Sequence, residues 1–161
     1  MARTSFPVAL LGNLFSDAVT GQRYFSSVDL IHDRPLYLRE SQYPGSRMFN
    51  GGRNVTNPAF SLPVGTGYGD APRNQLRGFD AVQVNAAVRR DIPIHSGVSL
   101  QFRAETYNIL NHPNFGYIDP SLTDLLFGQA TKMLNQSFGS TGALYQQGGP
   151  RSVQFVFKLT F

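Results

Sequence analysis

Three segments of this chain alternate between apolar and polar residues, which is the pattern of β-strands with two different faces. They are residues 79–90, 97–109 and 152–161. The apolar positions of the first two are Val82, Val84, Ala86, Val88, Val98, Leu100, Phe102 and Ala104. The polar positions between them include Gln83, Asn85, Arg89, Gln101, Arg103 and Glu105. In the third, one face carries Val153, Phe155, Phe157, Leu159 and Phe161, and the other carries Gln154, Lys158 and Thr160, with Val156 the exception.

Two architectures fit such strands. In a membrane β-barrel, strands of about nine to eleven residues turn their apolar face to lipid and their polar face to the lumen. In a soluble β-sandwich, the apolar face lies in a protein core. The connections favour the barrel, because residues 91–96 form a short link whereas 16–78 and 110–151 are very long. Structureless loops of that size are uncommon in compact soluble domains, but barrels have short turns on one side and long loops on the other.

We therefore predict an all-β fold of antiparallel strands from the C-terminal end of a transmembrane β-barrel, with long extracellular loops. The unit spans residues 1–161, with strands at about 3–15, 79–90, 97–109 and 152–161 and loops at about 16–78 and 110–151. The eight apolar positions of the first two strands are expected to face lipid. The residues expected to face the lumen are Gln83, Asn85, Arg89, Gln101, Arg103, Glu105 and Lys158.

The pattern also predicts finer details. The 91–96 turn is expected on the periplasmic side, with Pro93 at the turn because it cannot donate a ladder hydrogen bond. Matching apolar faces place Phe102 opposite Ala86 and Arg103 opposite Asn85. Residues 127–134 favour an extended hairpin within the second long loop over a helix at 124–133. The last strand, which finishes on an aromatic residue, resembles the C-terminal signal for insertion of outer-membrane proteins, carried by Val153, Phe155, Phe157, Leu159 and Phe161.

Composition narrows the functional classes. Only 15% of the 161 residues are charged, below the roughly 25% that is usual for soluble proteins. The chain has no cysteine, which excludes disulfides and thiolate chemistry. It has no run of about 18 apolar residues, so a membrane assignment rests on strands. The formal charge is +4, but the arginines are scattered without a basic run, and we expect no nucleic-acid partner.

Candidate chemistry is sparse, and we expect no enzyme, cofactor or metal site. His32, His95 and His112 are isolated and lack the spacing of metal ligands. Residues 65–70 lack the spacing and the Lys-Ser/Thr pair of a phosphate loop. The charged lumen positions have two interpretations: the wall of a substrate path, or a ladder of cross-strand ion pairs and hydrogen bonds that satisfies the barrel interior or a plug. We favour the ladder, because every such barrel needs a polar interior.

Several stretches carry a family resemblance. They are 100–116 (LQFRAETYNILNHPNFG), 127–131 (FGQAT), 149–161 (GPRSVQFVFKLTF), 2–8 and 73–79. These stretches resemble the C-terminal part of Oar-like TonB-dependent receptors of the acidobacterial type. The resemblance implies a bacterial outer-membrane transporter whose barrel of about 22 strands surrounds a plug. The implied partners are outer-membrane lipid, the barrel-assembly machinery, and TonB through the N-terminal part of the parent receptor.

The number of predicted strands limits what the chain does alone. About four strands cannot close a barrel, since small barrels need roughly eight. We therefore expect a fragment of a receptor, with a structural role and no transport of its own. The alternative is a soluble or surface-attached β-rich module that binds glycans or proteins through its Tyr- and Asn-rich loops.

Overall fold

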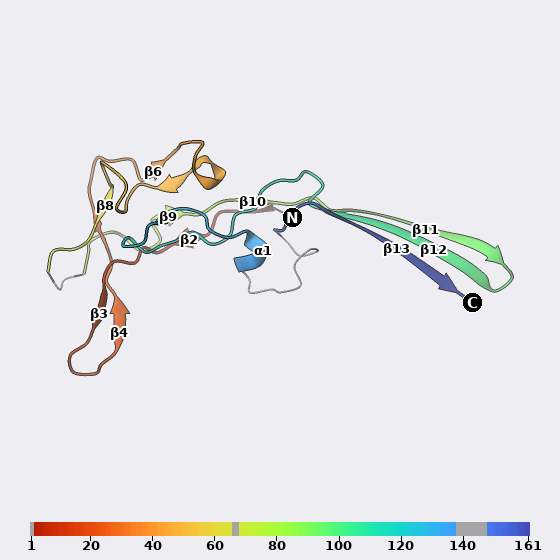
Figure 1. Cartoon of the computed structure of the whole chain (residues 1–161), viewed down its shortest axis with the longest axis horizontal. Coiled ribbons are helices and arrows are strands. Elements are labelled where there is room, and N and C mark those ends of the chain that lie inside the picture. Colours follow the sequence, from red (N-terminus) through yellow and green to blue (C-terminus); the bar gives the residue numbers. More distant parts are fainter. Residues whose placement is uncertain (1, 66–67, 138–147) are drawn as a thin grey trace.

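A long three-stranded sheet projects from an assembly of short strands and loops (Figure 1). The computed structural model describes residues 2–65, 68–137 and 148–161. Helical structure in these ranges is limited to η1 (Pro44–Ser46) and α1 (Leu134–Ser137). All strand pairs are antiparallel, which confirms the predicted all-β class. No helix of the described ranges has the length and apolar character needed to cross a membrane.

The long sheet consists of β11 (Ala86–His95), β12 (Val98–Tyr107) and β13 (Ser152–Thr160), in that order. The predicted 91–96 turn is wrong, because β11 continues to His95 and the chain reverses at Ser96 and Gly97. Gly97 has φ 84°, a conformation that glycine adopts without a steric penalty. Pro93 lies inside the strand, which β11 tolerates because it is at the edge of the sheet.

The later turn changes the register. Phe102 lies opposite Arg90 and Arg103 opposite Arg89, four residues further along β11 than predicted. Ala86 pairs with Thr106 instead. The shift is an even number of residues, so each side chain stays on its predicted face of the sheet. The hydrophobic pattern thus determined the face, while the position of the turn determined the pairing.

The predicted strand at 3–15 is three short strands with three different partners. They are β1 (Ala2–Arg3), paired with β10 (Ala81–Val82), β2 (Pro7–Val8), paired with β9 (Leu76–Arg77), and β3 (Leu14–Ser16), paired with β4 (Arg23–Phe25). A close approach interrupts the run at Gly12, where a Cβ would overlap the side chain of Ser26. The predicted strand at 79–90 is likewise divided between β10 and β11.

The long connections contain paired structure. Within 16–78, β5 (Asp29–Leu30) pairs with β8 (Phe60–Ser61), and β6 (Tyr37–Leu38) pairs with β7 (Met48–Phe49). Within 110–151, the N–H of Gly116 donates to Lys132 O over 2.8 Å, and the N–H of Thr131 donates to Tyr117 O over 2.9 Å. These bonds make the extended hairpin that the sequence favoured, in irregular form. Residues 66–67 and 138–147 of the two predicted loops lie outside the described residues.

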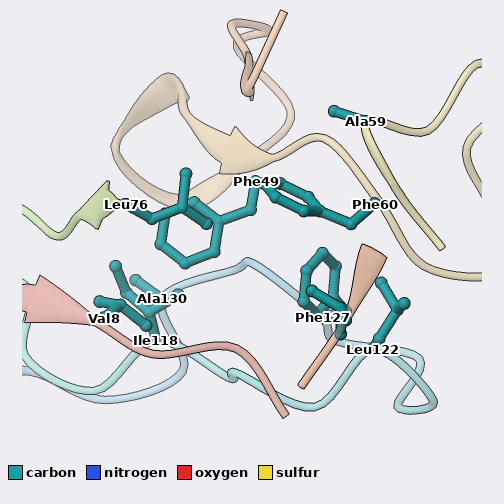
Figure 2. Packing of buried hydrophobic residues seen from close by; sticks show 10 residues of the cluster. Val8, Phe49, Ala59, Phe60, Leu76, Ile118, Leu122, Phe127 and Ala130 are labelled. Carbon is teal, nitrogen blue, oxygen red and sulfur yellow. The ribbon is translucent and has the colours of Figure 1, made fainter. Parts of the chain in front are cut away.

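The hydrophobic core lies in this part of the molecule, which we call the loop assembly (the described residues of 2–82 and 111–137). Figure 2 shows Phe49, Phe60 and Leu76 on one side of the core and residues of β2 and the 115–133 hairpin on the other. Burial of each Phe ring contributes about 2–3 kcal/mol. The members of the cluster are Val8, Val28, Phe49, Ala59, Phe60, Leu76, Ile118, Leu122, Phe127 and Ala130, and none belongs to β11, β12 or β13.

Candidate functional site

One face of the long sheet carries mainly apolar side chains, which lie opposite one another on neighbouring strands. Phe102 pairs with Phe157, and their ring centroids are 5.2 Å apart, while the ring of Phe155 lies 6.2 Å from that of Phe102. Phe155 and Phe157 are 63% and 68% exposed. Soluble monomers rarely expose a contiguous patch of this kind, so the face requires apolar surroundings. The face includes Ala86, Val88, Ile92, Val98, Leu100, Phe102, Ala104, Val153, Phe155, Phe157 and Leu159.

Arg90 is the charged exception on this face, where Thr106 is a polar but uncharged one. Arg90 lies directly opposite Phe102 and shares the parity of Val88 and Ile92. It lies in the middle of β11, at the level of Phe102 in β12, so the apolar face already carries one cation there.

The opposite face is a ladder of polar contacts. Arg89 Nη2 lies 3.0 Å from Asp91 Oδ2, and Gln101 Nε2 donates to Asp91 Oδ1 over 2.8 Å. Arg103 pairs with Glu105, two residues along its own strand. Since Arg89 lies directly opposite Arg103, the two carboxylates offset a repulsion between like charges. Both ion pairs run along a single strand, whereas the ladder was predicted to contain cross-strand ion pairs; the contact that crosses between β11 and β12 is the hydrogen bond from Gln101 to Asp91. Lys158 lies beside Gln101 on the same face.

Two residues that the sequence placed on the lumen wall lie instead where the sheet joins the loop assembly. Gln83 is buried, donates from Nε2 to Asn85 Oδ1 over 2.8 Å, and accepts from the N–H of Gly148 over 2.6 Å. The N–H of Asn108 also donates to Asn85 Oδ1, over 3.1 Å. The cause of the difference is that β11 begins only at Ala86, so 83–85 belong to the junction. For the same reason Val82 and Val84 lie outside the three-stranded sheet.

Asn108 completes this junction, a role that the alternating pattern did not predict. Its Nδ2 donates to His112 O and to Gly149 O, both over 2.9 Å. Asn108 has φ 50°, a left-handed conformation in which Asn is enriched. We call Gln83, Asn85, Asn108 and Asn114 the amide cluster, since Asn114 Oδ1 accepts from the N–H of Val82 over 2.8 Å. The signal in the sequence was the density of Asn in 108–114.

The loop assembly contains a cavity of about 400 Å³. Its inner wall includes Val28, Phe60 and Leu76, which also belong to the core. Its lining comes from 8–11, 25–28, 60 and 68–76, which are far apart in sequence. Alternation along single strands gives no signal for a surface of that kind, so the cavity was not predictable from the sequence.

In the described ranges, no group of three or more His, Asp or Glu residues is placed so that it could hold a metal ion. His95 ends β11. His112 Nδ1 lies 3.3 Å from Asn114 Oδ1, within the amide cluster's surroundings. The features that stand out are therefore the two-faced sheet, the amide cluster and the loop cavity.

Comparison with known proteins adds one finding. A family model described as an outer membrane beta barrel domain matches residues 2–154. A search of the curated proteins finds no match, and neither does a search of the solved structures.

Proposed function

This chain belongs to the family of outer membrane beta barrel domains, and from that premise we propose that it forms part of the wall and the extracellular loops of a TonB-dependent receptor. It is a protein of the bacterial outer membrane. The role proposed for the chain is structural: the long sheet crosses the lipid and the loop assembly covers its outer end.

The observation that carries this proposal is the division of the sheet into an apolar and a polar face. Strands β11 and β12 have ten residues each and β13 has nine, the length that a tilted strand needs to cross a bilayer. Both pairings place the apolar side chains of the three strands on the same face of the sheet. A barrel wall requires this arrangement, because lipid lies on one side and a polar interior on the other.

The sheet by itself is an open part of such a wall. In the described sheet, β11 and β13 each pair with β12 alone, so each has an outer edge. Unpaired backbone groups are not tolerated in hydrocarbon. We therefore propose that further strands complete the barrel on both sides, as expected for one section of a larger receptor.

The narrower assignment to Oar-like receptors rests on the resemblance of residues 100–116 and 149–161. Those stretches form β12, the amide cluster's Asn108 and Asn114, and β13. The proposed partners are outer-membrane lipid, the barrel-assembly machinery and TonB, the last through other segments of the receptor. The chain supplies no proposed catalytic step.

Replacing Phe102 by arginine tests the membrane assignment. Phe102 is in the middle of β12, so the new cation would lie near the bilayer midplane, where it costs about 2–4 kcal/mol. It would also face Arg90 directly. We expect Phe102→Arg to lose heat-modifiable, membrane-integrated protein in outer-membrane fractions.

Gln101→Arg is the matched control, because Gln101 is the adjacent residue and points to the polar face. It should integrate close to the wild-type level. If Phe102→Arg integrates as well as Gln101→Arg, the apolar face does not contact lipid. Cross-linking in the same membranes tests the narrower proposal: TonB should be captured by the receptor that carries this chain, and a barrel of another class would not capture it.

A further inference from the structure

The loop cavity has the size of a small-molecule site. Its volume of about 400 Å³ is at the lower end of the range for cavities that hold small organic ligands. Such a volume suits a compound with one or two rings and excludes a folded polypeptide segment. The cavity is in the loop assembly, so it is separate from the sheet on which the proposed membrane role depends.

Hydrogen bonds between distant segments fix the walls of the cavity. The N–H of Ala71 donates to Val28 O over 2.9 Å, and Ser27 Oγ donates to Gly69 O over 2.8 Å. Gly69 lies so close to Val28 that a Cβ would overlap its backbone. Walls held in this way form before any ligand arrives, which lowers the entropic cost of binding.

The mouth of the cavity presents flat aromatic surface. Phe25 and Tyr68 both line it, and they are 49% and 72% exposed. Tyr68 stacks on Tyr24, with ring centroids 6.0 Å apart and an interplanar angle of 28°. Tyr24 in turn packs on Phe15 across the β3–β4 pair, with centroids 5.9 Å apart. A planar ring that entered the mouth would find apolar faces already positioned for stacking.

Two polar groups of the lining have unused capacity. Arg73 forms no ion pair or hydrogen bond with any residue of the described ranges. Gln75 also lines the cavity, and its Oε1 is enclosed without a hydrogen-bond partner among those residues. The guanidinium matches a carboxylate in charge and in its paired donor geometry. The amide oxygen of Gln75 can accept from a hydroxyl once the amide rotates.

From these features we propose that the loop cavity binds a small hydroxylated aromatic carboxylate. The ring stacks at Phe25 and Tyr68, and the carboxylate pairs with Arg73. The hydroxyl group donates to Gln75 at the inner end. The apolar wall of Val28, Phe60 and Leu76 surrounds the ring and excludes water from it.

Titration of 4-hydroxybenzoate into the detergent-solubilised full-length protein tests this proposal, with calorimetry as the readout. We expect saturable binding at or below about 1 mM for the wild type. Arg73→Ala should weaken it about ten-fold or more, because the carboxylate loses its charged partner. Arg53→Ala is the matched control, since Arg53 lines a different cavity of about 280 Å³. The affinity of this variant for 4-hydroxybenzoate should stay at the wild-type value.

Further comparisons separate the contribution of the carboxylate contact from nonspecific binding. The wild type should bind the neutral analogue 4-hydroxybenzamide about ten-fold more weakly than 4-hydroxybenzoate. Arg73→Ala should bind the two compounds with equal affinity. If Arg73→Ala is not recovered in folded form, Arg73→Gln and Tyr68→Ala replace it, and each should weaken binding. Absence of saturable binding to the wild type, or equal affinity in the Arg73 variants, would overturn the proposal. Because membrane integration is measured separately on Phe102→Arg, failure of one proposal leaves the other standing.

Discussion

Replacing Phe127 by alanine tests whether the loop assembly is a folded unit with a core of its own. Phe127 is 1% exposed, and its ring lies 6.3 Å from that of Phe49 at an interplanar angle of 62°. Gly51 and Gly52 border the ring on another side. Since glycines carry no side chain that could fill the space, we expect a cavity and a cost near the usual 3–5 kcal/mol for Phe→Ala.

That cost should appear as easier opening of the loops. Each 1.4 kcal/mol is a factor of ten, so the open population should rise by about two to three and a half powers of ten. Protease added to isolated outer membranes reports this population when opening is fast compared with cleavage. We expect rapid cleavage within the loop assembly of Phe127→Ala, while β11, β12 and β13 stay protected in the membrane.

Leu126→Ala is the control for this experiment, because Leu126 is the preceding residue and is 49% exposed. Truncation there should change the cleavage rate little. If Phe127→Ala resists protease as well as the wild type, or if both variants are cleaved equally, the cluster around Phe127 does not hold the loops together. The reasoning from burial would then be refuted for this part of the molecule.

Two other predictions concern the conformation of the loops. Gly128 has φ 74°, and a Cβ there would lie 2.6 Å from the backbone nitrogen of Phe49, so Gly128→Ala should cost more than about 2 kcal/mol in the same protease assay. Gly21→Ala is its control, since Gly21 has φ 69° with no atom within 4 Å and should show only the cost of the backbone conformation. The pKa of Asp17 lies below its usual value because the N–H groups of Thr20 and Val19 donate to its carboxylate. This contribution to stability is present above the unfolded pKa of about 3.8 and is lost as pH falls through the lowered value. Hydrogen-exchange protection of the Val19 and Thr20 amides should therefore decrease over this pH range in the wild type. It should not decrease in Asp17→Asn, which has no carboxylate to titrate.

The sheet was predictable from the sequence because its signal is local. Alternation within β12 and β13 identifies their faces without knowledge of the rest of the chain. The register was not predictable to the same degree, since it depends on a turn at Gly97 and not on one at Pro93. A two-residue displacement of the turn moved the partner of Phe102 from Ala86 to Arg90.

The loop assembly was not predictable, because its order comes from contacts between distant segments. Abundant glycine is typical of irregular loops, yet Gly69 and Gly128 permit close backbone approaches that hold such segments together. The amide cluster likewise connects Gln83 with Gly148, 65 positions apart. No periodicity along the chain encodes a contact of that kind, and the same holds for the loop cavity.

The hydrophobic cluster of the loop assembly takes no residue from the strands of the long sheet. Substitutions in that core therefore make no direct change to the apolar face of the sheet or to the pairing of its strands. The loop assembly can therefore change in sequence as a unit, while the two faces of the long sheet stay as they are. The amide cluster is a set of contacts at the junction that such a variant would have to keep, which makes it the natural splice point for chimaeras that graft a new outer surface onto this sheet.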